Sequence, residues 1–249
     1  MKRKKIVFIV NNFLVGGVER LLLDVISFLD KEKLDIKIVT VLGSGPLKDS
    51  FLKLGASIYF AGFSSRKLPF KLYWILVAPI TLIRLTFFLL KSKPDVVVTS
   101  LFQADVLGMI AAKIVGVEKR ILIQHDIVQF KKAIRIVKKM FALKYATQVV
   151  AISETVKSFL IEYFEVKSEK INIIFNGINY EVFKKGRREV LNSSTSVVGI
   201  VGRLEKVKGH IYALKALKFL KEQHGLSPTI LLAGDGTLRS TLEKYTKEN

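Results

Sequence analysis

The sequence contains no cysteine, which excludes disulfide bonds, thiolate metal sites and cysteine nucleophiles. Histidine is scarce as well: His125, His210 and His224 are scattered along the chain, so no zinc site is predicted. The basic N-terminus leads into an apolar run, Ile6–Val10, that is too short for a signal peptide. These absences fit a protein of a reducing compartment, and we expect it in the cytoplasm.

Half of the 249 residues are hydrophobic, which suffices for a large core and argues against global disorder. The formal net charge is +20. Such an excess of Lys and Arg suits binding to nucleic acid or to an anionic membrane surface. A genome that favours Lys codons would give the same excess without any binding partner. No helix-turn-helix, zinc finger or aromatic-interleaved basic strand occurs, so we predict no nucleic-acid partner.

Nine short apolar runs rich in β-branched residues alternate with helix-like segments. Their apolar residues are continuous, which is typical of parallel strands covered on both faces. We therefore predict an α/β fold with a doubly wound sheet. The expected strands are Lys5–Val10, Ile36–Leu42, Ser57–Ala61, Asp95–Ser100, Arg120–Gln124, Gln148–Ile152, Ile171–Phe175, Val197–Val201 and Thr229–Leu232. The clearest expected helices are 18–29, 103–115 and 153–164, the last with Ser153 as its N-cap.

The pattern indicates two domains of unequal completeness. Residues 1–183 make an N-terminal Rossmann-like domain, and the polar, Ser-rich stretch 184–196 is expected to be a linker. Residues 197–249 begin a second Rossmann-like domain with only two strands. We expect this second domain to be incomplete and partly exposed.

Residues 72–90 are apolar except for Arg84 and reach the lower limit for a membrane span. A buried crossover helix is the simpler interpretation, because a predicted strand follows at once. Partial insertion at a membrane surface is the alternative, and Tyr73 and Trp74 would suit an interface.

A second amphipathic piece, residues 131–141, adds to the membrane alternative. Its cations are expected on one helical face, which is usually only solvated. They are Lys131, Arg135, Lys138 and Lys139.

Four loops follow predicted strands, at the edge where open α/β sheets bind ligands. Gly16-Gly17 precedes a helix and would let a ligand approach its N-terminus, although a tight turn explains the pair equally well. His125 follows a strand and either contacts a sugar or is an ordinary loop residue. Asn176-Gly177 is a turn or a crossing between domains.

The fourth loop carries Arg203 and Lys208 between Gly202 and Gly209, after a buried strand and before a helix. Backbone N–H groups and fixed positive charge converge in such a loop, which suits a diphosphate. Arg presents a planar fork to two phosphate oxygens, and Lys presents a point charge.

Taken in order, these motifs resemble the retaining group-1 (family-four) glycosyltransferases of GT-B architecture. The resemblance extends over residues 16–236. It is carried by Gly16-Gly17-x-Glu19-Arg20, Lys93-Pro94-Asp95-Val96-Val97, His125-Asp126, Ser153-Glu154, Asn176-Gly177-Ile178, Gly202-Arg203-Leu204 with Lys208-Gly209, and Gly234-Asp235-Gly236.

The resemblance implies transfer of a sugar, with retention, from a nucleotide-diphosphate sugar to a glycan or lipid-linked acceptor at the inner membrane face. Arg203 and Lys208 would neutralise the leaving diphosphate, so that no metal is needed, in agreement with the absence of an Asp-x-Asp motif. His125 would contact the transferred sugar. The donor site would also include Gly16, Gly17, Gly234 and Asp235.

One family motif is missing from the sequence. The family carries Glu-x7-Glu in its second domain, and no such pair follows Asp235. We therefore expect a C-terminally truncated chain with little or no activity by itself. The alternative is a non-catalytic remnant, or one subunit of a split enzyme whose partner chain completes the site.

Overall fold

The structure is a computed structural model that describes residues 3–63, 69, 72–128, 131–184 and 197–248. The chain folds as two compact units, Met1–Phe183 and Lys184–Asn249, hereafter unit 1 and unit 2. Except for Lys184, the expected linker 184–196 lies outside the described residues.

Unit 1 contains a parallel seven-stranded sheet in the order β3-β2-β1-β4-β5-β6-β7. This order is that of a doubly wound α/β fold and confirms the predicted fold class. The strands are β1 (Lys4–Val10), β2 (Leu34–Thr40), β3 (Ser57–Phe60), β4 (Val96–Ser100), β5 (Lys119–Gln124), β6 (Gln148–Ala151) and β7 (Ile171–Ile173).

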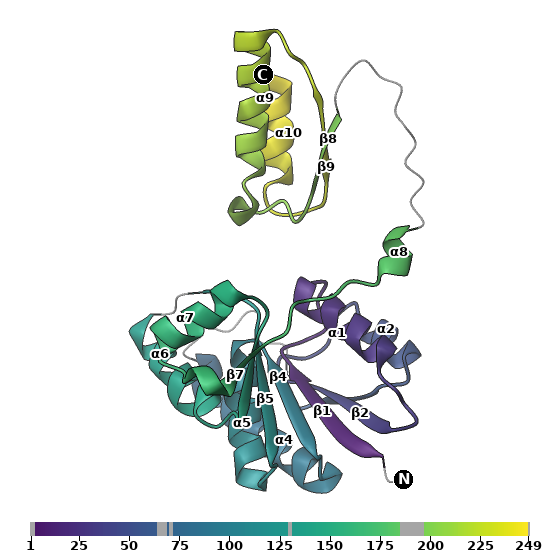
Figure 1. The fold of residues 1–249 in the computed structure, drawn as a ribbon, viewed down its shortest axis with the longest axis vertical. Coiled ribbons are helices and arrows are strands. Elements are labelled where there is room, and N and C mark those ends of the chain that lie inside the picture. Colours follow the sequence, from purple (N-terminus) through teal and green to yellow (C-terminus); the bar gives the residue numbers. More distant parts are fainter. Residues whose placement is uncertain (1–2, 64–68, 70–71, 129–130, 185–196, 249) are drawn as a thin grey trace. The chain divides into compact units, whose positions relative to one another are not determined.

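Helices cover both faces of this sheet (Figure 1). Alternate residues of β1 point to opposite faces. Phe8 and Val10 pack with α1 (Gly17–Phe28) and α2 (Lys48–Lys53), whereas Val7 and Ile9 pack with α4 (Ala78–Ser92) and α5 (Phe102–Val115). Double coverage explains why the strands are apolar throughout. The helices of unit 1 are α1 (Gly17–Phe28), α2 (Lys48–Lys53), η1 (Tyr73–Val77), α4 (Ala78–Ser92), α5 (Phe102–Val115), α6 (Lys132–Val137), η2 (Lys138–Leu143), α7 (Glu154–Phe164), η3 (Ser168–Lys170) and α8 (Tyr180–Lys184, which crosses the boundary between the units).

Unit 2 contains a parallel pair, β8 (Val197–Val201) and β9 (Thr229–Ala233). Its helices are η4 (Lys206–Lys208), α9 (His210–His224) and α10 (Arg239–Glu248). A small core forms where Leu204, Leu214 and Leu242 meet. Most residues of β8 and β9 are exposed.

All nine expected strands are present, and their ends shift by at most two residues. The N-cap prediction is also confirmed, because the Ser153 hydroxyl accepts a hydrogen bond from the Val156 amide at 3.2 Å. The apolar segment 72–90 forms η1 and most of α4, which pack on the sheet as the crossover helix before β4.

Candidate active site

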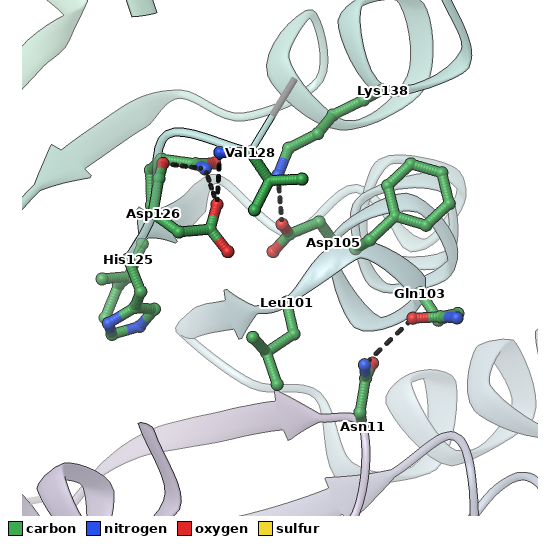
Figure 2. Close-up of a pocket in the computed structure, with 11 residues that line it drawn as sticks. Asn11, Leu101, Gln103, Asp105, His125, Asp126, Val128 and Lys138 are labelled. Atoms are coloured by element: carbon green, nitrogen blue, oxygen red, sulfur yellow. Dashed lines mark hydrogen bonds and ion pairs between the residues drawn. The ribbon is translucent and has the colours of Figure 1, made fainter. Parts of the chain in front are cut away.

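A pocket of about 210 Å³ opens at the carboxyl edge of the sheet of unit 1 (Figure 2). It lies where β1 and β4 pair, the point at which the strand order reverses and where doubly wound sheets bind ligands. Its walls come from the segments that follow β1, β4 and β5. The lining residues are Asn11, Leu101, Phe102, Gln103, Asp105, Ile123, Gln124, His125, Asp126, Val128 and Lys138.

Asn11 joins two walls of the pocket. Its amide nitrogen donates to Gln103 Oε1 at 3.0 Å (Figure 2), and its Oδ1 accepts from the Ala104 amide at 3.0 Å. Beside them, Leu101 has φ 77° and ψ 153°, a conformation that residues with side chains rarely adopt. The rigid strand β4 and helix α5 hold this unfavourable backbone at the pocket wall, as is common at ligand sites.

His125 is half-buried, and its Nε2 lies 3.3 Å from Ser100 Oγ. Burial lowers the pKa of His125 to about 4; Lys138 adds to this effect, and Asp126 opposes it. The imidazole is therefore neutral at pH 7 and can donate one hydrogen bond and accept another. Gln124 fixes the adjacent loop by donating to the backbone oxygen and Oδ1 of Asp126, at 2.7 and 2.9 Å.

A buried ion pair forms the floor of the pocket (Figure 2). Lys138 Nζ lies 3.2 Å from Asp105 Oδ2, and the Thr99 hydroxyl donates to Asp105 Oδ1 at 2.9 Å. Burial raises the pKa of Asp105, and the neighbouring ammonium and hydroxyl oppose this effect. The pair places fixed, hydrogen-bonded charges in the wall of the pocket.

The sequence did not predict this pair. Lys138 was expected on a solvated helical face with Lys131, but it is 3% exposed. The π-helix η2 begins at Lys138, and its i→i+5 bonding shifts the side chains relative to an α-helix. One indication was available: Asp105 stands in an otherwise apolar stretch of α5, where a carboxylate needs a partner.

Gly16 and Gly17 lie at the N-terminus of α1 and are not among the residues that line the pocket. A Cβ on Gly16 would lie 2.4 Å from Glu19 Oε2, so a side chain there would displace the carboxylate of Glu19. Glu19 is buried, which raises its pKa. A Cβ on Gly17 would meet nothing within 4 Å, so a ligand could approach the backbone at this position.

In unit 2, the loop between β8 and α9 carries Arg203 and Lys208, and both side chains are exposed. Gly209, with φ 71°, turns the chain into α9, whose 15 residues begin at His210. A positive side chain therefore lies at either end of a short loop at the amino end of a long helix. Free backbone N–H groups and the helix dipole favour anions at such a position.

This loop is joined to the one that follows β9. The Leu204 amide donates to the Asp235 oxygen, and the Leu238 amide donates to the Leu204 oxygen, each at 2.9 Å. Gly234 approaches Gly202 so closely that a Cβ would lie 1.9 Å from the Gly202 oxygen. The four residues predicted for the diphosphate and nucleotide therefore lie on neighbouring loops of unit 2, namely Arg203, Lys208, Gly234 and Asp235.

The fold is Rossmann-like, and its candidate ligand sites lie at the carboxyl ends of parallel strands. Residues 15–182 match the sequence profile of Glycosyltransferase Family 4. The chain belongs to this family, in agreement with the resemblance of its motifs.

Two curated relatives are glycosyltransferases. The chain is 28% identical over 248 residues to the UDP-Gal:alpha-D-GlcNAc-diphosphoundecaprenol alpha-1,3-galactosyltransferase of Escherichia coli, with 92% of this chain and 62% of the relative covered. It is 27% identical over 169 residues to the capsular polysaccharide biosynthesis glycosyltransferase CapM of Staphylococcus aureus, with 62% and 44% covered. The chain thus spans less than two thirds of the length of either relative.

The fold also resembles that of Anabaena Alr3699/HepE, whose crystal structure contains UDP and glucose. The TM-score is 0.73 at 21% sequence identity, with 99% of this chain and 64% of the other covered. At this level of identity the similarity supports the GT-B fold alone.

Proposed function

We propose that the protein is the part of a glycosyltransferase that binds a nucleotide-diphosphate sugar and transfers the sugar to an acceptor hydroxyl in surface-polysaccharide or glycolipid synthesis. The observation that carries this proposal is the arrangement of Arg203 and Lys208 on the loop before α9. Family membership and the relatives named above support it.

In the reaction, the bond between the anomeric carbon and the diphosphate oxygen breaks, and a bond from that carbon to the acceptor oxygen forms. Negative charge grows on the diphosphate as it leaves, and the acceptor hydroxyl loses its proton. Arg203 and Lys208 would stabilise the growing charge, in the role that a divalent cation has at other diphosphate sites. We propose that no metal is required.

The pocket of unit 1 suits the sugar and acceptor side of this reaction. Neutral His125 can hydrogen-bond a sugar hydroxyl, and Asn11 and Gln103 add polar groups to other walls of the same pocket. We further propose that the transfer retains the anomeric configuration, as the family motifs imply. The anomeric proton coupling of the product by NMR tests this point.

We propose that the reaction takes place in the cytoplasm, at the inner face of the membrane, with a glycan or lipid-linked acceptor. The absence of cysteine fits a reducing compartment, and the net charge of +20 suits anionic lipid. The E. coli relative is named for a diphosphoundecaprenol acceptor, which supports a lipid-linked acceptor here.

Calorimetric titration of the purified chain with UDP, GDP and ADP tests the donor site. We expect one nucleotide to bind best, and Arg203→Ala and Lys208→Ala each to weaken its binding about 10- to 100-fold. Lys206→Ala removes the same charge from the same loop and should change the affinity less than threefold. Equal losses for all three variants would instead indicate binding of polyanions through bulk charge.

A transfer assay with the matching sugar nucleotide tests the alternative function. Transfer by this chain alone would exclude a non-catalytic chain, whereas nucleotide binding without transfer is expected both of a truncated enzyme and of a subunit whose partner completes the site.

A further inference from the structure

The helix formed by η1 and α4 has two apolar faces, although only one of them is covered. Tyr73, Leu85 and Leu89 pack into the core beneath the sheet and are at most 3% exposed. The opposite face is 49–68% exposed and consists of Ile75, Leu76, Ile80, Ile83, Phe87 and Leu90, hereafter the α4 apolar face. From Leu76 onward they recur every three or four residues, which places them along one side of the helix, and Ile75 lies beside Leu76 in η1.

Among the residues that the structure describes, no charged side chain interrupts the α4 apolar face. Arg84, the one charged residue of segment 72–90, turns toward β3: its Nη2 donates to the Phe60 oxygen at 2.8 Å, and its guanidinium lies 5.0 Å from the Phe63 ring centre. The hydroxyl of Thr86 donates to the Leu82 oxygen at 2.8 Å within the helix. An ordinary surface helix presents polar residues to water, so this exposed face requires another environment.

Basic side chains gather where this face ends. Lys91 is exposed at the last turn of α4, and Lys93 is exposed just after it. Helix α5 packs against α4, and both run toward the same edge of the sheet, because each leads into a parallel strand. Lys113 is exposed in the last turn of α5, so it lies toward the same end. An apolar face beside clustered cations in a chain of net charge +20 complements an anionic lipid surface.

We propose that the α4 apolar face docks on an anionic lipid bilayer, with the helix lying in the plane of the interface. The helix qualifies as a membrane span by length and mean hydropathy, but its inner side is committed to the sheet. A transmembrane orientation would remove Leu85 and Leu89 from the core, so the helix lies on the bilayer without crossing it. This inference deepens the proposed membrane location and does not require catalysis.

The amino end of the helix that carries the α4 apolar face lies beside the pocket of unit 1. The Trp74 ring packs against Phe102, with ring centres 5.9 Å apart, and Phe102 lines the pocket. If the proposed function is correct, an acceptor anchored in the bilayer would reach the pocket from this end. Tyr73 does not contribute to the surface as the sequence suggested, because it is 3% exposed.

Co-sedimentation of the full chain with lipid vesicles tests the proposal. We expect binding to vesicles of phosphatidylcholine mixed with phosphatidylglycerol and little binding to phosphatidylcholine alone. Phe87→Glu should weaken binding at least tenfold. Phe28→Glu is the matched control: Phe28 is 70% exposed, against 68% for Phe87, but lies on α1, and its replacement should weaken binding less than threefold. Lys91→Gln should weaken binding about fivefold.

Trp74 emission and far-UV circular dichroism check that each variant is folded. Equal losses for Phe87→Glu and Phe28→Glu, or unchanged binding by Phe87→Glu, would overturn the proposal. So would self-association of the lipid-free chain that Phe87→Glu abolishes, because this face would then be an interface between copies. The assay contains no sugar nucleotide, so a failure of the proposed transferase function would leave vesicle binding intact.

Discussion

The two units contain strands of similar sequence that differ greatly in burial. In unit 1, Ile9 of β1 and Val97 of β4 are 0% exposed, because helices cover both faces of the sheet. In unit 2, β8 and β9 are as apolar, yet Val201 is 87% exposed and Leu231 is 56% exposed. An apolar, β-branched run therefore predicts a parallel strand, but it does not predict how much of that strand is covered.

The two units also differ in the interactions that stabilise the loops of their candidate sites. The pocket of unit 1 rests on a buried ion pair, whereas the loops of unit 2 are joined by backbone hydrogen bonds, and the ion pairs described there are exposed. Buried charge is costly to leave unpaired, whereas exposed pairs contribute little. We therefore expect substitutions in the interior of unit 1 to have the larger effects. Trp74 is the only tryptophan, and its emission reports on unit 1 alone.

The largest effect is expected for Lys138→Met, which leaves the Asp105 carboxyl group buried without its cation. We expect unit 1 to lose about 3–5 kcal/mol of stability in urea unfolding followed by Trp74 emission. The double variant Asp105→Asn/Lys138→Met should lose less than Lys138→Met alone, because no charge is then stranded.

Lys139→Met is the matched control for this prediction. Its ammonium pairs with Glu165 on the surface, where the two side chains are 43% and 76% exposed, so it should lose less than about 1 kcal/mol. Similar losses for the neighbouring variants Lys138→Met and Lys139→Met would contradict the interpretation of the buried pair.

The nine strands were predicted from the sequence, whereas the burial of Lys138 was not, and this difference shows what the sequence can reveal. The positions of the strands, their parallel arrangement and the loops that follow them can be predicted from the local pattern of apolar residues, which is visible in the sequence. The partner of Asp105 depends on a π-helix that starts at Lys138 and on the packing of η2 against α5, and neither leaves a local pattern. The loop of Arg203 and Lys208 was identifiable because its glycines and cations are adjacent in sequence.

The next largest effect is expected from His125 and concerns how the stability of unit 1 depends on pH. The unfolded chain binds a proton on His125 near its ordinary pKa of 6.5, whereas the folded chain does so only near 4. Stability should therefore be complete above pH 6.5 and fall as the pH is lowered toward 4, by at most about 3 kcal/mol.

Urea unfolding at several pH values, followed by Trp74 emission, measures this slope. His125→Asn should remove it, whereas His224→Asn, in α9 of unit 2, should leave it unchanged. Because both variants keep Asp105, its raised pKa affects them equally. The same slope in His125→Asn and the parent chain would show that His125 is not the group that titrates.

The smallest effects come from adding one methyl group to each unit. In unit 1, a Cβ on Gly108 of α5 would lie 2.7 Å from Thr99 Cγ2 and 3.1 Å from Ile9 Cδ1, and both neighbours are fully buried. Thr99 cannot move freely, because its hydroxyl is bonded to Asp105. We expect Gly108→Ala to destabilise unit 1 by about 1–2 kcal/mol, since overpacking outweighs the better helix propensity of Ala.

In unit 2, a Cβ on Gly199 of β8 would meet nothing within 4 Å. The substitution Gly199→Ala then acts mainly on the unfolded chain and should stabilise unit 2 by about 0.4–1 kcal/mol. Hydrogen exchange of amides in β4 and in β8 reports the two units separately. If Gly199→Ala instead accelerated exchange in β8, the open face of that strand would have to be covered in solution, and the contrast between the units would lose its basis.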